Sequence, residues 1–201
     1  MEGDEEVVAF LDVMRRLRAE CPWKAAQTHR SLARYLLEET HETLEALDTG
    51  DTALLREELG DLLLQVFLHT VMAEQAGDFT TADVARDVTA KMVRRNPHVF
   101  GEDAGRDDLD PATVNELYEA SKAEEKQRTS VTEGLAPGLP ALLYADKVLD
   151  RAARAGRPLD VPDDPTGSTD LGDRLLALVA EARATGADPE QALRDAVRRR
   201  L

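Results

Sequence analysis

Apolar residues recur at spacings of three and four positions along most of this sequence, which is the period of an amphipathic α-helix. The first twenty residues show the pattern at Val7, Phe10, Leu11, Met14 and Leu17. The pattern breaks at residues that end helices, namely Pro22, Gly50, Gly77 and Pro97. We therefore expect helices over about residues 4–20, 31–48, 52–77, 81–95, 111–128 and 189–199, with two more on either side of the turn-rich residues 156–169.

Composition supports a single class of secondary structure. Leu, Ala, Glu and Arg dominate the chain, and these residues are good helix formers. Aromatic residues, which are enriched in strands, make up only 4% of the sequence. The sequence therefore predicts an all-α protein.

A stretch rich in proline and glycine, TEGLAPGLP, interrupts the helical pattern after the fifth of these helices. We expect a helical domain over residues 1–128, a linker over 129–140 and a helical tail over 141–201. Part of the tail repeats the domain, because DLGDRLL at 170–176 resembles ELGDLLL at 58–64. This echo indicates an incomplete second copy.

Forty acidic and twenty-five basic residues give a formal net charge of -15. Such a surface repels nucleic acid and anionic lipid, so we expect neither as a partner. An anionic substrate would need local positive charge, which bound metal ions supply. The single cysteine, the absence of a signal-peptide pattern and the absence of a long apolar run predict a cytoplasmic protein.

Two pairs of carboxylates are spaced so that each pair projects from one side of its helix. Glu39 and Glu42 are three residues apart, as are Glu58 and Asp61. In an antiparallel helix pair, these four side chains can converge between the helices. A single Glu-x-x-Glu pair is more often a solvated acidic face, so the surroundings of the second pair matter.

The helix that carries Glu58 and Asp61 is apolar nearly all round, which predicts a buried helix. Buried carboxylates need cations or donors, and no lysine or arginine occurs between Arg56 and Arg86. Oxygen ligands without a thiol cluster select Mg²⁺ or Mn²⁺. A divalent-metal site and a set of ion-paired structural carboxylates are the two interpretations that remain.

Four segments in order, CPWKAAQTH, LLEETHETLEAL, REELGDLLLQV and RRNPHVFG, resemble the MazG family of nucleoside triphosphate pyrophosphohydrolases. The resemblance covers roughly Val7 to Arg128. It implies an all-α fold in which a four-helix bundle, usually completed by homodimerisation, holds Mg²⁺ on E-x-x-E and E-x-x-D motifs. It also implies hydrolysis of a triphosphate to nucleoside monophosphate and pyrophosphate, with nucleotide house-cleaning as a family-level role. The metal ligands implied by position are Glu39, Glu42, Glu58 and Asp61.

Further site residues follow from their positions beside these motifs. Glu38 adjoins the first pair and is a candidate base, although a solvated helix residue fits equally. Lys122 occupies the lysine position of a W-x-x-x-K pattern found in the family. Candidate phosphate-binding residues at the end of the fourth long helix are Lys91, Arg94 and Arg95; basic residues at helix ends also serve the helix dipole.

Trp23 and Gln27 are candidates for lining a nucleobase pocket, and plain packing of the only tryptophan is the alternative. Two residues depart from the family pattern. Lys24 stands where the family usually has aspartate, and Tyr118 replaces the tryptophan of W-x-x-x-K, so substrate preference is open. The tail lacks an E-x-x-E helix, and we expect it to be catalytically silent. Cys21 has no evident activating base.

Three other functions deserve comparison. A ferritin-like di-iron bundle uses two Glu-x-x-His motifs, and this chain has one, at Glu38 and His41. A non-enzymatic helical interaction module would explain the acidic helices but not four intact motif carboxylates. A related pyrophosphatase with a narrow preference, for dUTP or a phosphoribosyl-nucleotide, shares the metal motif.

Overall fold

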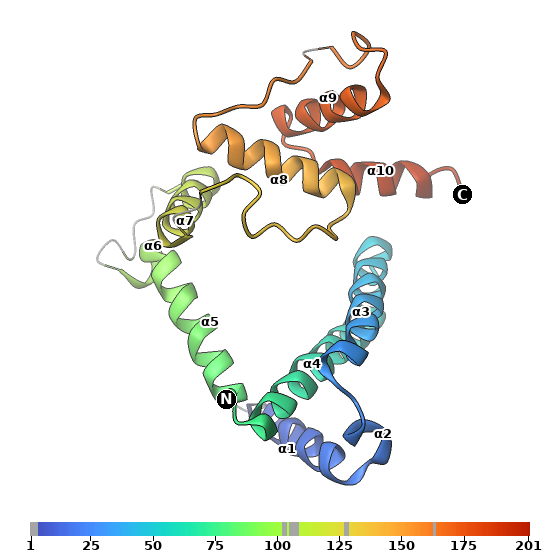
Figure 1. Cartoon of the computed structure of the whole chain (residues 1–201), viewed down its shortest axis with the longest axis vertical. Helices are drawn as coiled ribbons and strands as arrows, with labels where there is room; N and C mark the ends of the chain where they lie inside the picture. The colour runs from blue at the N-terminus through green and yellow to red at the C-terminus, as the bar shows by residue number, and fades with distance from the viewer. Residues whose placement is uncertain (1–3, 102–103, 105–108, 127–128, 163) are drawn as a thin grey trace. The chain divides into compact units, whose positions relative to one another are not determined.

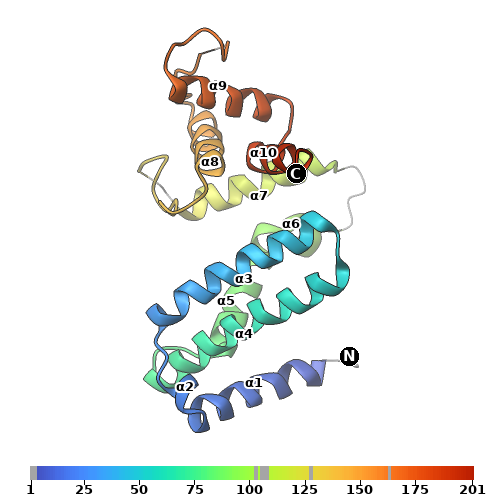
Figure 2. The ribbon, with the colours of Figure 1, turned by 90° about the vertical axis from the view of Figure 1, so that its right-hand side faces the viewer.

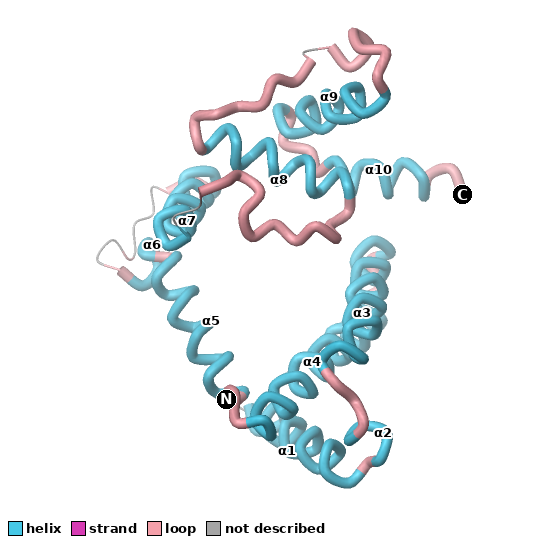
Figure 3. The backbone as a smooth tube through the Cα atoms, in the orientation of Figure 1, coloured by secondary structure: helices cyan, strands magenta, loops and turns pink. Residues whose placement is uncertain are grey.

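The computed structural model describes residues 4–101, 104, 109–126, 129–162 and 164–201. Within these residues every regular element is a helix (Figure 3). The all-α prediction is therefore confirmed. No helix in these ranges combines the length and the apolar character that crossing a membrane requires.

The chain divides into two compact units, Met1–Tyr118 and Glu119–Leu201. The long helices of the first are α1 (Asp4–Glu20), α3 (His29–Thr49), α4 (Thr52–Ala76) and α5 (Thr81–Arg95). Its short helices are α2 (Pro22–Ala25) and α6 (Pro97–Phe100), and α7 (Pro111–Lys126) crosses the division. The second unit contains α8 (Ala141–Arg154), α9 (Leu171–Ala184) and α10 (Pro189–Arg198).

Helices α3 and α4 form an antiparallel hairpin (Figure 1). Gly50 ends α3 in the left-handed conformation, with φ of 70°, which suits a residue without Cβ. Asp51 then caps α4 by accepting from the backbone N–H of Ala53 at 2.9 Å and of Leu54 at 3.1 Å. Thr28 and Ser31 form a capping box at the other end of α3. Local sequence therefore fixes where both helices begin.

The core of the first unit lies where α1 packs against α4, with α4 between α1 and α3 (Figure 2). Phe10 and Phe67 contact each other with ring centroids 5.6 Å apart. The fully or nearly buried members of this core are Met14, Leu32, Phe67, Leu68, Val71 and Met72. This core packs the second half of α4 against α1 and the start of α3.

The prediction that α4 is buried on every side is wrong for the part of the helix before Phe67. Leu59 is 52% exposed, and Val66 is also exposed, whereas the residues from Phe67 to Ala73 are mostly buried. The reason is that α1 and α3 cover only part of α4 within one chain. Helix α5 touches α4 near its own start, where Thr81 and Thr70 hydroxyls lie 2.7 Å apart.

The predicted linker is packed against the second unit. Arg151 of α8 donates to the backbone oxygens of Val131 at 3.2 Å and Glu133 at 2.7 Å, which fastens this segment to α8. The division between units consequently falls within α7 and before residue 129. In the same unit, Arg183 of α9 pairs with Asp146 at 3.1 Å and Asp150 at 2.9 Å of α8.

Candidate metal and nucleotide site

Three carboxylates from the two helices of the hairpin converge. Glu39 of α3 and Glu58 and Asp61 of α4 each offer an oxygen, and these oxygens lie within 4.8 Å of one another. We call these three residues the acid cluster. It is the one group of at least three potential metal-ligating side chains found in the described part of the chain. The hairpin therefore brings the two predicted motif pairs together.

The acid cluster is electrostatically strained in the absence of a cation. Burial, followed by the charges of Glu42, Asp61 and Glu57, raises the pKa of Glu58. Burial, followed by the charges of Asp61 and Glu42, raises the pKa of Glu39. Both shifts mean that this environment disfavours the ionised forms of Glu39 and Glu58.

One oxygen of the acid cluster has no partner. Glu58 is 8% exposed, and its Oε2 is buried without a hydrogen bond from any described residue. Buried carboxylates are normally paired or coordinate metals. Because no described lysine or arginine pairs with the three residues, ion-paired structural carboxylates do not explain the geometry. An all-oxygen donor set with an unsatisfied buried lone pair fits a hard divalent cation.

The remaining predicted acidic residues lie at the edge of the acid cluster. Glu42 is exposed and lies one turn after Glu39 on α3. It influences the pKa of both Glu39 and Glu58. Glu38 and His41 are exposed on α3, and neither belongs to the acid cluster.

Trp23 lies on α2 beside the hairpin. Its ring meets Tyr35 edge-on with centroids 6.0 Å apart, and Tyr35 precedes Glu39 by one helical turn. The Lys24 ammonium lies 5.0 Å from the centroid of the Trp23 ring. Gln27 donates to the Trp23 carbonyl at 3.0 Å and accepts from the Ser31 hydroxyl at 2.7 Å. Gln27 thus fixes the segment that presents Trp23.

The predicted phosphate-binding residues occupy different environments. Lys91 is half-buried and Arg94 is exposed near the end of α5. Arg95 is 7% exposed, lies over the Tyr118 ring at 5.5 Å and donates to its hydroxyl at 3.4 Å. Lys122 lies in the second unit and pairs with Glu119 at 2.8 Å.

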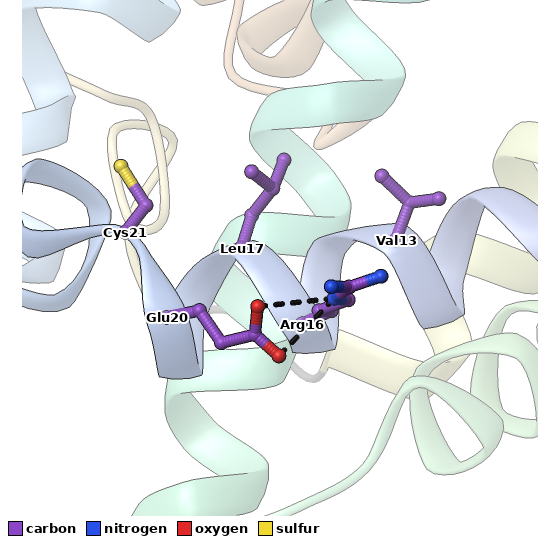
Figure 4. Close-up of a pocket in the computed structure, with 5 residues that line it drawn as sticks. All are labelled: Val13, Arg16, Leu17, Glu20 and Cys21. Atoms are coloured by element: carbon purple, nitrogen blue, oxygen red, sulfur yellow. Dashed lines mark hydrogen bonds and ion pairs between the residues drawn. The ribbon is translucent and has the colours of Figure 1, made fainter.

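Cys21 lies at one end of a pocket of about 410 Å³ on α1 (Figure 4). The other lining residues are Val13, Arg16, Leu17 and Glu20. Arg16 and Glu20 pair with each other at 3.0 Å, so this carboxylate is already engaged by a cation.

Two polar features of the hairpin were not predicted as site residues from the sequence. Gln65 is buried on α4 one turn after Asp61, and its spacing was the available signal. His29 and His69 come from different helices, and their Nδ1 atoms lie 2.7 Å apart. Only the packing of α3 on α4 could reveal this pair.

The first unit is thus an all-helical unit in which three carboxylates gather between two antiparallel helices. Residues 27–100 match the MazG nucleotide pyrophosphohydrolase domain. The chain is 45% identical to an uncharacterized 26.1 kDa protein of Streptomyces cacaoi, across 92% of this chain and 76% of that protein.

Other relatives carry functional names. A nucleoside triphosphate pyrophosphohydrolase of Mycobacterium tuberculosis is 45% identical across 81% of this chain and 50% of its own length. The nucleoside triphosphate pyrophosphohydrolase/pyrophosphatase MazG of Thermotoga maritima is 34% identical across 97% of this chain and 81% of its own length. The chain therefore belongs to the MazG family of nucleotide pyrophosphohydrolases, a family of enzymes, and the predicted resemblance is confirmed.

Proposed function

We propose that this chain hydrolyses nucleoside triphosphates to nucleoside monophosphate and pyrophosphate with Mg²⁺, or Mn²⁺ in its place. Glu39, Glu58 and Asp61 would hold the cation, with Glu42 at the edge. The observation that carries the proposal is the buried, unpartnered Glu58 Oε2 inside a group of three carboxylates. The names of the relatives from M. tuberculosis and T. maritima support the reaction.

The acid cluster has the chemistry that hydrolysis of a phosphoanhydride bond requires. A divalent cation, when bound, neutralises charge on phosphate oxygens and lowers the pKa of a coordinated water. The protein's part is to fix the carboxylates on two capped helices, so that they need little reorganisation. Glu38, which is exposed on α3 and precedes Glu39 in the chain, is the proposed base.

Substrate contacts on the first unit begin at Trp23, whose exposed ring can stack on a nucleobase. Lys24 gives this ring a cationic neighbour that an aspartate would not give, so we assign it a role in base preference. Lys91, Arg94, Arg95 and Lys122 remain proposed phosphate contacts. A broad substrate range, consistent with cytoplasmic nucleotide house-cleaning, and a narrow preference for one pyrimidine nucleotide both fit the acid cluster.

A homodimer would complete the helical bundle. The hairpin exposes large apolar side chains on both helices, including Leu37 on α3 and Leu59 and Val66 on α4. Large apolar side chains exposed on two adjacent helices favour an interaction site. A two-fold copy would pair hairpin with hairpin and give four helices. We propose this arrangement as the active form.

Two functions from other classes have less support. A di-iron centre requires histidine ligands, and the acid cluster contains no histidine among the described residues. In a purely structural interaction module, the burial and mutual repulsion that raise the pKa of Glu39 and Glu58 would destabilise the fold without serving a function. Nucleic acid remains an unexpected partner for a chain with a net charge of -15.

The reaction can be tested with each ribo- and deoxyribonucleoside triphosphate, with Mg²⁺, Mn²⁺ or a chelator, and chromatography of the products. We expect monophosphate and pyrophosphate only when metal is present. Glu58→Gln should reduce kcat/KM by more than about 100-fold, because loss of a ligand exceeds loss of an outer-shell partner. Glu57→Gln, which changes the exposed neighbouring carboxylate, should keep wild-type activity within a few-fold.

Three results would contradict the proposal. One is hydrolysis that continues in chelator. Another is release of diphosphate and orthophosphate in place of pyrophosphate. The third is an equal loss of activity in Glu57→Gln and Glu58→Gln, which would indicate a general charge effect.

A further inference from the structure

Gln65 is the most buried polar side chain near the acid cluster. It is 4% exposed, and its Oε1 is buried without a hydrogen bond from any described residue. Burying a carboxamide oxygen without a donor destabilises a fold. Such a group in the middle of a well-packed helix therefore needs an explanation.

Gln65 shares its side of α4 with the acid cluster. Glu58, Asp61 and Gln65 stand at positions i, i+3 and i+7, which form one stripe on a helix. Four residues of helix rise only about 6 Å between Asp61 and Gln65. Side chains on a helix lean toward its N-terminus, so a residue four positions after Asp61 leans toward the turn that carries Asp61.

The chemistry of the neighbours determines what can satisfy the Gln65 oxygen. Ionised carboxylates accept hydrogen bonds and cannot donate, so Glu58 and Asp61 leave Oε1 unsatisfied. No lysine or arginine occurs between Arg56 and Arg86. A water molecule can bridge two acceptors, because it offers two donors. A metal-bound water is a stronger donor than bulk water, because the cation polarises its O–H bonds.

We propose that Gln65 is a positioning residue whose Oε1 accepts a hydrogen bond from a water held by the cation at the acid cluster. This inference rests on the proposed function. The carboxamide takes up no proton; it fixes the direction of one O–H bond and thereby the remaining lone pair of the water. Oriented water ligands strengthen metal binding and favour attack on phosphorus.

The test compares Gln65→Met with wild type in three measurements. Methionine has a similar length and no unsatisfied carbonyl, so the metal-free thermal midpoint should be equal to or higher than that of wild type. Mn²⁺ affinity, measured by calorimetry, should fall about 10- to 100-fold, as is usual for loss of an outer-shell partner. The value of kcat should fall by a similar factor, with KM for the triphosphate nearly unchanged.

Two further variants sharpen the test. Gln65→Glu keeps an acceptor oxygen at the same place, so it should bind Mn²⁺ within a few-fold of wild type while its metal-free form is less stable. Gln75→Met is the matched control, because Gln75 lies on the same helix and accepts from Arg18 at 3.0 Å. This variant should leave Mn²⁺ affinity unchanged.

The outcomes separate the two proposals. Wild-type protein that neither binds Mn²⁺ nor hydrolyses triphosphates overturns the proposed function. An active wild type with an equally active, equally Mn²⁺-binding Gln65→Met variant overturns only the role of Gln65. A Gln65→Met variant whose metal-free form is less stable than wild type, or a Gln65→Glu variant as impaired as Gln65→Met, also overturns it.

Discussion

At the residue scale, burial shifts the pKa of both acidic and basic side chains within the hairpin. It raises the pKa of the acids Glu39 and Glu58 and lowers the pKa of His69, because it disfavours the charged form in each case. His69 is paired with His29 through the two Nδ1 atoms, and its Nε2 is buried without a partner. A buried N–H without an acceptor is rare, so we assign the shared proton to Nδ1 of His69 and the lone pair to its Nε2.

The histidine pair predicts loss of stability in mild acid. Burial and the charge of His29 lower the pKa of His69 from its ordinary value of 6.5. Below about pH 6.5 the unfolded chain binds a proton at residue 69 more readily than the folded chain does. The free energy of unfolding is therefore highest above about pH 6.5 and falls as the pH drops toward the lowered pKa. Urea unfolding between pH 7.5 and 5 should show a smaller decrease for His69→Gln than for wild type.

The charged side chains near His29 and His69 do not reverse the predicted loss of stability at low pH. Arg18 of α1 donates to the backbone oxygens of Lys24 and Gln27 just before His29, and Glu74 after His69 pairs with Arg15. His41→Gln, at an exposed position on α3, is the control and should follow wild type. Parallel pH profiles for wild type and His69→Gln would contradict the prediction.

At the scale of single elements, the ends of α3 and α4 determine the geometry of the site. The turn at Gly50 and Asp51 makes the two helices antiparallel, and this places Glu39 opposite Glu58 and Asp61. Capping residues therefore affect the acid cluster without contacting it. In the tail, Asp170 caps α9 and Asp173 accepts from Ser168, so the echo of the motif has a local structural role there.

Removal of the α4 cap should destabilise the fold measurably. Asp51→Ala loses hydrogen bonds to two backbone N–H groups, and we expect the free energy of unfolding to fall by about 1 kcal/mol. Thr52→Ala changes the next, exposed residue and should stay within about 0.5 kcal/mol of wild type. Urea denaturation at constant m-value measures both changes. Equal midpoints for the two variants would show that the cap contributes nothing.

At the scale of the whole molecule, the two units differ in the acidic and exposed apolar residues that they carry. The first unit carries the acid cluster and leaves Leu59 half-exposed beside it, on the same helix. The second unit has its own small core around Leu149, Ala152, Ala177 and Val179. The exposed side of α4 is the surface on which we propose that a second copy packs.

A charge on this face should prevent association. Wild type should elute as a homodimer in size-exclusion chromatography with light scattering, and Leu59→Glu should give monomers, because an unpaired carboxylate cannot be buried in an apolar interface. Leu193→Glu, at a similarly exposed position (55%) on α10, should remain dimeric. A monomeric wild type would contradict the proposed dimer.

The sequence by itself determined the helices, because local periodicity, glycine at Gly50 and the cap at Asp51 act over a few residues. It also determined the pairing of Glu39 with Glu58 and Asp61, since motif spacing and a two-residue turn leave little freedom. Tertiary structure alone decided which polar atoms lose water. Several features depend on contacts between segments that are distant in the sequence, and the local hydrophobic period does not predict such contacts. These features are the unpartnered oxygens of Glu58 and Gln65, the His29–His69 contact, the half-exposed Leu59 and the packing of 129–140 on α8.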